Sequence, residues 1–294
     1  MAKARALDKR RKSIKNIRKI TRTMELVSTA QFRRALERAV DAASYTKRIA
    51  RLVADLANAD LKVEHPLLVR RESTKKAVLL ILTANRGLCG GYNAGVLRAG
   101  TARLEELSKS YDEVELFVSG KRGVSHLNYR GVNISRSFTQ FDHKTSYDDV
   151  LVLADECLTR YRLGEIDRFD VAYSRFVSLS KQYPASETLL PLADMTDDVV
   201  VREDGAGGEL EYEFLPSPES ILEEIVPNAF RIKLFKCFLD AAVSEQIARM
   251  MAMKAATDNA DSMISSLTTT YNRARQSQIT NEIIEVISGA SALK

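Results

Sequence analysis

The residues whose types and spacing suggest chemistry most directly form the glycine-rich stretch Asn85–Asn93, with the sequence NRGLCGGYN. It follows an apolar run and precedes a helical pattern, and such turns can bind phosphates through backbone N–H groups. The stretch matches neither a P-loop nor the dinucleotide pattern, because no Gly-Lys-Ser/Thr follows and the glycine spacing differs. We therefore favour a structural glycine turn, and an α/β enzyme that binds a nucleotide there stays open as an alternative.

Side chains that ligate metals or attack substrates are few and scattered. The three cysteines and three histidines are Cys89, Cys157, Cys237, His65, His126 and His143. Their spacing fits no metal motif, and three cysteines fit free thiols in a reducing compartment better than disulfides. No nucleophile–base or paired-carboxylate pattern has structural support. We expect no catalytic residue, no metal and no cofactor, and we favour mechanical or scaffolding work over enzymology.

The N-terminus is strongly basic. Residues 1–65 carry seventeen Lys or Arg and seven Asp or Glu, a net charge of +10, whereas the whole chain carries +5. A nucleic-acid-binding surface is one interpretation of this basic region. No aromatic residue lies among the first 22 residues to stack on bases, so a solvated face or an acidic protein partner fits equally well.

Glycine and proline divide the chain into three parts. All six prolines and twelve of the thirteen glycines fall between residues 66 and 227. Since both residues are costly inside helices, we predict a long helix over 1–65, a compact α/β domain over 66–215 and a second long helix over 216–294.

The two long helices carry apolar or small residues at steps of three and four, which predicts a coiled coil. The predicted seam of the second helix is Met253, Ala256, Ala260, Met263, Leu267, Thr270, Ala274, Ser277, Asn281 and Ile284. That of the first is Ile14, Ile17, Ile20, Met24, Val27, Gln31, Ala35, Ala39, Ala42, Tyr45, Ile49, Leu52 and Leu56, with Asp8 as a cap. With a domain between them, the helices are expected to pair antiparallel, and the longer second helix to project past the first.

The middle of the chain alternates strand and helix signals, which predicts a mostly parallel, Rossmann-like sheet with helices on its faces. The predicted strands are 77–83, 114–120, 132–138, 169–179 and 188–192, and the predicted helices 93–110, 121–129 and 146–163. We expect 194–213 to be a loop or an irregular hairpin. The longest apolar run, Ala77–Leu82, is far too short to span a bilayer, so any membrane contact would go through partners.

Several long stretches resemble the gamma subunit of F-type ATP synthase, of the bacterial type. They are Lys19–Val27 with Arg33–Ala35, Arg86–Gly91, Ser244–Asn259 and Tyr271–Ala290. The matches lie in the family's order and cover both ends and the middle of the chain.

The resemblance implies a rotor. In this family the terminal helices form the central stalk inside a ring of three alpha and three beta subunits, and the middle domain sits with the epsilon subunit on the membrane c-ring. Ion flow turns the stalk, which drives the beta sites through different nucleotide affinities. A family member does no bond chemistry itself, binds no nucleic acid and lies peripherally at the cytoplasmic face of the bacterial inner membrane. The alternative is a basic coiled-coil protein that binds nucleic acid or acts as a scaffold.

The resemblance also implies residue roles. The residues that match family positions in contact with beta are Met24, Arg249, Arg275, Gln276 and Thr280, and those of the structural glycine turn are Arg86, Gly87, Gly90 and Gly91. Asn85 stands where many relatives carry Asp, which puts ionic contacts there in doubt. The inserted cysteine pair of the chloroplast relatives is absent, so no thiol switch is expected.

Overall fold

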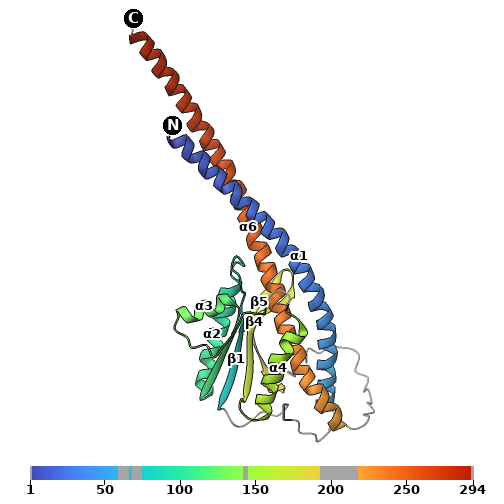
Figure 1. The fold of residues 1–294 in the computed structure, drawn as a ribbon. Helices are drawn as coiled ribbons and strands as arrows, with labels where there is room; N and C mark the ends of the chain where they lie inside the picture. The colour runs from blue at the N-terminus through green and yellow to red at the C-terminus, as the bar shows by residue number, and fades with distance from the viewer. Residues whose placement is uncertain (1, 59–65, 68–74, 142–144, 193–217, 293–294) are drawn as a thin grey trace. The chain divides into compact units, whose positions relative to one another are not determined.

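A computed structural model describes residues 2–58, 66–67, 75–141, 145–192 and 218–292 (Figure 1), with the side chains of the two long helices described over 5–41 and 223–288. Contacts group the chain into two compact units. The helical pair comprises Met1–Thr29 and Arg249–Lys294, and the central unit comprises Ala30–Ala248. The predicted boundaries at 65/66 and 215/216 involve residues outside the described ranges, so the three-part division stays a prediction.

Two helices supply the helical pair, α1 (Ala2–Asn58) and α6 (Pro218–Ala292). At about 1.5 Å per residue, the 75 residues of α6 extend roughly 110 Å. Pro218 occupies the first helical position, where a missing N–H costs nothing. Pro227 lies inside α6, within the range 216–294 that the sequence predicts for the second long helix.

The prediction that Asp8 caps the first helix was wrong. Helix α1 extends back to Ala2 because no glycine or proline interrupts the residues before Asp8. Asp8 instead accepts a hydrogen bond from Arg11 at 2.7 Å and lies 3.0 Å from the ammonium of Lys12. It therefore forms ion pairs within the helix.

The central unit contains a five-stranded sheet with the order β3-β2-β1-β4-β5. Its strands are β1 (Lys76–Leu82), β2 (Glu113–Ser119), β3 (Arg136–Phe138), β4 (Arg168–Ser178) and β5 (Lys181–Leu190). Strands β1, β2, β3 and β4 pair in parallel, with β1 between β2 and β4. Right-handed crossovers through helices give this order in Rossmann-like sheets, which confirms the predicted fold class.

Strand β5 differs from its prediction. It begins at Lys181 and pairs antiparallel with β4 across a short connection, so that β4 and β5 form a hairpin. The sequence predicted only 188–192 in this strand, a stretch that follows Pro184 and includes Pro191. Pro184 is tolerated because β5 is the edge of the sheet. The expected loop at 194–213 lies outside the described residues.

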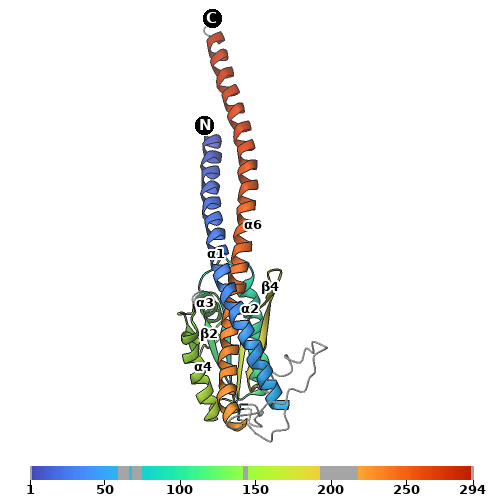
Figure 2. The same cartoon turned by 90° about the vertical axis from the view of Figure 1, so that its right-hand side faces the viewer.

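Helices cover both faces of the sheet (Figures 1 and 2). They are α2 (Tyr92–Ser110), α3 (Lys121–Tyr129), α4 (Tyr147–Arg162) and, from α6, its residues within the central unit. Side chains of β1 alternate between two cores: Ala77, Leu79 and Ile81 pack with α2 and α3, and Val78 and Leu80 with α4 and α6. A strand buried on both faces reads as a continuous apolar run, as β1 does.

A third apolar cluster joins α1 to α6 inside the central unit. Phe32, Ala35 and Ala39 of α1 pack with Leu239, Val243 and Ile247 of α6. The small residues of α1 let the helix axes approach closely. The sequence predicted Ala35 and Ala39 in this role.

A buried polar cluster fixes the β4–β5 hairpin to α6. Glu187 accepts a hydrogen bond from Tyr173 at 2.7 Å, and its carboxylate lies 3.2 Å from both Arg175 and Lys233. Burial alone would raise the pKa of Glu187, but Lys233, Tyr173 and Arg175 together hold it below its usual range. This carboxylate is therefore charged and paired at neutral pH.

Asp240 lies in the same cluster and is less well compensated. The pKa of its carboxyl is raised to about 6, mainly by burial and in smaller part by Glu187 on β5, while Lys236, Arg175 and Lys233 oppose the shift. Lys236 is 4.0 Å away, beyond hydrogen-bond distance. Charging Asp240 in the folded state therefore costs free energy.

We expect Asp240→Asn to stabilise the protein at pH 7.5 by up to roughly 3 kcal/mol, the equivalent of a shift from the ordinary Asp pKa to about 6. The folded pKa is raised, so the penalty is complete above pH 6 and disappears below the unfolded pKa of 3.8. Denaturant unfolding of both proteins between pH 4 and 8 measures this. A variant that is equally stabilising at pH 4 and pH 8 would contradict it.

Candidate functional site

The helical pair is an antiparallel contact between the start of α1 and the end of α6. The hydroxyl oxygens of Thr21 and Thr257 lie 2.8 Å apart. Further along, Arg18 forms an ion pair with Asp261. The Arg11 guanidinium then lies over the Tyr271 ring, 4.8 Å from its centroid. Residue numbers fall on one helix as they rise on the other, which confirms the antiparallel coiled coil.

The line of contact on α1 departs from the predicted seam at three positions, whereas the predicted Ile14, Met24 and Gln31 are half-buried. Thr21 and Ser28 are buried, whereas the predicted seam residues Ile17, Ile20 and Val27 are 45%, 61% and 43% exposed. Steps of three and four placed these three apolar residues in the predicted seam. The contact instead uses smaller polar residues one position along, which leaves isoleucines on the outside.

The same shift occurs on α6. Buried or half-buried residues recur at alternating steps of four and three: Met253, Thr257, Ala260, Ile264, Leu267, Tyr271, Ala274 and Gln278. Ala252, Ala256 and Thr268 beside this line are half-buried as well. The predicted Met253, Ala260, Leu267 and Ala274 belong to this line, and the predicted Ala256 is half-buried. The predicted residues that are exposed are Met263, Thr270, Ser277, Asn281 and Ile284. The seven-residue period was correct, but Met263, Thr270 and Ser277 each stand one position before the half-buried residue.

The far end of α6 lies beyond the reach of α1. Arg11 is level with Tyr271 and α1 begins at Ala2, so α1 ends level with about residue 280. Residues 281–288 are all exposed, and α6 continues past the N-terminus in Figures 1 and 2. The exposed large apolar side chains here are Ile279, Ile283, Ile284, Val286 and Ile287. A lone helix with this much exposed apolar surface is typical of a binding surface.

The five predicted coupling residues fall into two groups. Met24 is half-buried and Arg249 is 5% exposed, and both lie on the same side of the Thr21–Thr257 contact. The other three, Arg275, Gln276 and Thr280, are exposed on α6. At about 1.5 Å per residue, Arg249 and Arg275 are roughly 40 Å apart. The residues therefore mark two stretches of the helical pair and not one pocket.

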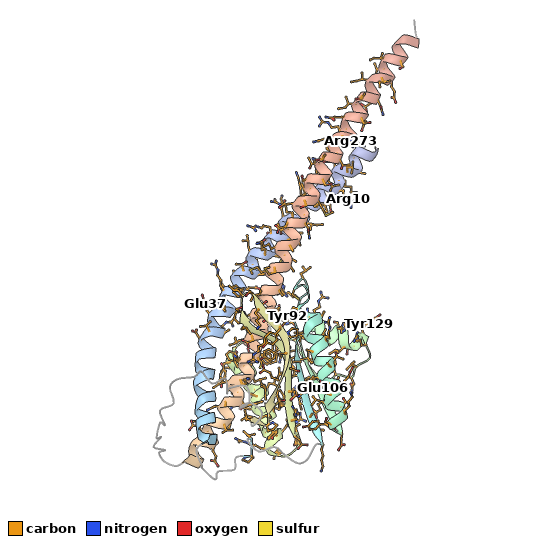
Figure 3. All side chains as sticks on the ribbon, turned by 180° about the vertical axis from the view of Figure 1, so that it is seen from behind. Arg10, Glu37, Tyr92, Glu106, Tyr129 and Arg273 are labelled. Carbon is orange, nitrogen blue, oxygen red and sulfur yellow. The ribbon has the colours of Figure 1, made fainter. Side chains whose placement is uncertain are left out.

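Surface charge on the helical pair is mostly basic. Exposed cations of α1 are Arg5, Lys9, Arg10, Lys12, Lys15, Arg18, Lys19 and Arg22. Arg273 and Arg275 of α6 are exposed as well, and Figure 3 shows Arg10 and Arg273 on the pair. This surface suits acidic partners.

The glycine turn is held by hydrogen bonds within the central unit. Asn85 accepts from the Lys121 backbone N–H at 3.1 Å and donates to the carbonyls of Thr139 and Phe141. Asn93 accepts from the Ala84 N–H at 2.9 Å. The Asn85 amide thus joins three segments, although the sequence analysis treated it as a departure that weakens ionic contact.

Backbone conformation explains the glycines of the turn. Gly90 has φ 54°, in the left-handed region that favours glycine. Leu88 shares that region with φ 64°, which is uncommon for a residue with a side chain. Gly87 packs against the Arg122 guanidinium, 3.1 Å from where a Cβ would lie. Arg86 is exposed.

The described residues offer little support for a metal site or a reactive cysteine. They include no group of three or more His, Cys, Asp or Glu side chains placed to hold a metal ion. The three cysteines are buried free thiols, and burial raises the pKa of Cys157 to about 12, which suppresses the reactive thiolate. None of the described helices is long and apolar enough to cross a bilayer.

Comparisons with known proteins agree along the whole chain. The family described as ATP synthase matches residues 3–293. The ATP synthase gamma chain of Rhodopirellula baltica is 55% identical over 295 residues, which is 100% of both chains. That of Leptospira biflexa is 37% identical over 293 residues, again 100% of both.

Solved structures resemble the fold. A chain of the Euglena gracilis mitochondrial ATP synthase (OSCP/F1/c-ring, rotational state 3) is 18% identical with a TM-score of 0.67, covering 99% of this chain and 95% of that one. A rotor chain of the same enzyme in rotational state 1 has a TM-score of 0.62 at 19% identity, with 95% and 99% coverage. At these identities the likeness concerns the fold alone.

Proposed function

This chain belongs to the ATP synthase gamma-chain family, and from that premise we propose that it is the central-stalk rotor of an F-type ATP synthase. It couples ion-driven rotation of the c-ring to ATP synthesis and hydrolysis at the beta subunits. The observation that carries the proposal is the antiparallel helical pair that continues as a single exposed helix. The alternative of a nucleic-acid-binding coiled coil has no support among the relatives.

A shaft that turns inside a ring of subunits must be slender and must not adhere to one position. The contact line of Thr21, Ser28, Thr257 and Ala260 uses small residues, which brings the two helices close together. Ile17 and Ile20, which a more stable coiled coil would bury, are exposed instead. The side chains that face the surrounding ring therefore differ from one side of the shaft to another.

Rotation can drive nucleotide sites only through contacts that differ between conformational states of the partners. Mobile acidic loops of the beta subunits would meet the basic surface of the shaft with an attraction that depends on its angle. We assign Met24 and Arg249 to one zone of contact with beta, and Arg275, Gln276 and Thr280 to the other. The chain itself makes and breaks no covalent bond.

The remaining partners follow from the same family. We propose that the central unit contacts the epsilon subunit and the c-ring, with Arg86, Gly87, Gly90 and Gly91 as a structural turn. The protein would lie peripherally at the cytoplasmic face of the bacterial inner membrane, with membrane contact only through partners. Three domains over 1–65, 66–215 and 216–294 remain part of this proposal.

Co-purification tests the proposal. A stable complex of this chain with alpha and beta ATPase subunits is the expected result. A chain that ignores these subunits and instead binds DNA with a steep salt dependence would contradict it.

Charge reversal tests the coupling zone near the end of α6. We expect Arg275→Glu to lower ATP-driven ion pumping several-fold per ATP hydrolysed, because an attraction to acidic groups becomes a repulsion of similar size, about 1 kcal/mol. Pumping and hydrolysis are measured on the same reconstituted vesicles. Arg273→Glu is the matched control, since it lies two residues away on a different face of the same helix and is also exposed. Equal effects of the two variants, or unaltered pumping per ATP hydrolysed in Arg275→Glu, would remove Arg275 from the site.

A further inference from the structure

Within the central unit, one face of α6 meets the hairpin of β4 and β5 through polar contacts. Lys233, Asp240 and Ser244 follow one another at steps of seven and four residues, so they lie on the same side of the helix. The Lys233 ammonium lies 3.2 Å from the carboxylate of Glu187 on β5. The Ser244 hydroxyl donates to the carbonyl of Ser174 on β4 at 3.1 Å, and this hydrogen bond is buried. These two contacts are separated by about 16 Å along the helix.

The faces of α6 on either side of this polar face are apolar. Leu239, Val243 and Ile247 pack in the cluster with α1, and Phe230 and Leu234 pack in the core with α4 and the sheet. The attraction between apolar surfaces has no preferred direction, whereas a hydrogen bond weakens steeply when its angle or length changes. The apolar faces therefore hold α6 against its neighbours, and the polar face is the more sensitive to its angle.

A small turn of α6 about its own axis would break the polar contacts. Turning the helix by about 20° moves side-chain atoms that lie about 5 to 6 Å from its axis by about 2 Å. A displacement of this size exceeds the range over which a hydrogen bond persists. The polar face therefore opposes rotation of α6 within the central unit.

The polar face also has a cost in stability. Asp240 is 3% exposed, and the Lys236 ammonium lies 4.0 Å away on the same helix. The other charged groups that act on Asp240 are Glu187 on β5, Arg175 on β4 and Lys233 on α6. Well-packed apolar residues are often as stable as buried charged groups, and in some proteins such groups are retained because they specify one geometry. The position of this face against the hairpin fits that role.

We propose that the contacts of Lys233 and Ser244 with the β4–β5 hairpin fix the rotational position of α6 in the central unit, and that they transmit torque between this unit and the helical pair. Lys233 and Ser244 are thus positioning residues. Helix α6 continues without a break from Ala248 in the central unit to Arg249 in the helical pair, so the angle held at Ser244 is passed along the chain. The proposal rests on the proposed function, since the restraint has a use only in a chain that carries torque.

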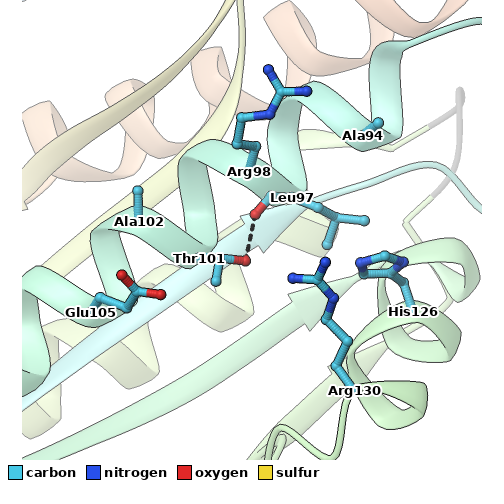
Figure 4. Close-up of a pocket in the computed structure, with 8 residues that line it drawn as sticks. All are labelled: Ala94, Leu97, Arg98, Thr101, Ala102, Glu105, His126 and Arg130. Atoms are coloured by element: carbon cyan, nitrogen blue, oxygen red, sulfur yellow. Dashed lines mark hydrogen bonds between the residues drawn. The ribbon is translucent and has the colours of Figure 1, made fainter.

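The test measures torsional stiffness in the assembled complex. The alpha and beta subunits are fixed to a surface, and a bead is attached through Lys109→Cys on α2, because the three native cysteines are buried. Helix α2 holds the bead firmly, since Leu97 packs in the core and the Thr101 hydroxyl donates to the Leu97 carbonyl at 2.7 Å (Figure 4). Rotation is halted with a non-hydrolysable ATP analogue, and the thermal fluctuation of the bead angle is recorded. The variance of that angle is inversely proportional to the torsional stiffness.

The double variant Lys233→Met/Ser244→Ala removes both polar contacts from α6. We expect the variance of the bead angle to rise about 1.5-fold or more, because a buried polar network that rigidifies its surroundings has lost two members. Glu187 keeps Tyr173 and Arg175 as partners. Ser244→Ala alone should raise the variance by a smaller amount, and it provides the test if the double variant does not fold. Circular dichroism identifies the variants that fold.

Two controls separate this restraint from a general loss of stability. Lys236→Met makes the same replacement on the same helix, but the carboxylate near Lys236 belongs to Asp240 of α6 itself. Leu127→Ala removes a buried side chain from the core beneath α3 and destabilises the central unit without changing the hairpin. Both controls should leave the variance of the bead angle as it is in the wild type.

Three results would overturn the proposal. If the variants at Lys233 and Ser244 that fold show the same variance as the wild type, the hairpin does not hold α6, while a wild-type bead that rotates with ATP leaves the proposed function standing. If Lys236→Met or Leu127→Ala raises the variance as much, general softening and not these contacts determines the stiffness. If the wild-type chain assembles with neither alpha nor beta subunits, this proposal and the proposed function both fail.

Discussion

Asp170→Ala should lower the free energy of unfolding by about 3 to 5 kcal/mol, the typical cost of removing one partner from a buried ion pair. The Asp170 carboxylate is 0% exposed and accepts hydrogen bonds from Arg103 at 2.6 Å and Arg168 at 2.9 Å. Both arginines also approach Thr188 on β5. Removing the carboxylate leaves the guanidinium groups of two partly buried arginines, 23% and 21% exposed, without their shared counterion. Denaturant unfolding measures the change.

An exposed pair in the same unit gives the matched control. Arg136 and Glu156 are also ion-paired, but their side chains are 44% and 37% exposed. Glu156→Ala should therefore cost no more than about 1 kcal/mol. Equal costs for Asp170→Ala and Glu156→Ala would show that burial does not determine the contribution of these pairs.

Removing residues 277–294 should reduce ATP-driven ion pumping by about tenfold or more, and leave unfolding of the central unit unchanged. The deletion takes away the apolar side chains at the exposed end of α6, among them Ile283 and Ile287. Burying one such side chain against a partner contributes about 1.5 to 3 kcal/mol, and about 1.4 kcal/mol is a factor of ten in rate. None of the residues removed belongs to a core cluster of the central unit.

Pumping by reconstituted vesicles and circular dichroism on the isolated chain measure the two effects. A matched deletion control is the quadruple substitution of Ile279, Ile283, Ile284 and Ile287 by Ser, which keeps the helix length and removes the apolar surface. If the truncated chain loses its central fold along with pumping, the shaft is not a separable element. If the quadruple variant pumps normally, length and not apolar contact is what matters.

The fold was predictable where the hydrophobic pattern of a segment matches its burial in the folded chain. The strand β1, for example, is a continuous apolar run between turn signals, and both of its faces are buried. The phase of the coiled coil was not predictable, because the sequence offers Ile20 and Thr21 side by side and hydrophobicity alone selects Ile20. The structure buries Thr21, whose hydroxyl meets Thr257, a residue 236 positions away. A polar pair across such a distance has no local sequence signal.

Some features of the candidate site could likewise be predicted from the sequence, and others could not. Arg275, Gln276 and Thr280 were selected through resemblance and stay a prediction; the structure shows that all three are exposed. The exposed isoleucines of α1 were misplaced in the seam, since exposure of apolar residues depends on a partner that the sequence of one chain does not contain. The pairing of Glu187 with Tyr173 and Lys233 was missed because it joins three separate elements.

Direct observation of rotation tests the central claim. All three native cysteines are buried, so a single Lys109→Cys on the exposed end of α2 provides a specific attachment point for a bead. With the alpha and beta subunits fixed to a surface, addition of ATP should turn the bead continuously in one direction. A bead that stays fixed while the same complexes hydrolyse ATP would contradict the account, because the chain would then be a static scaffold.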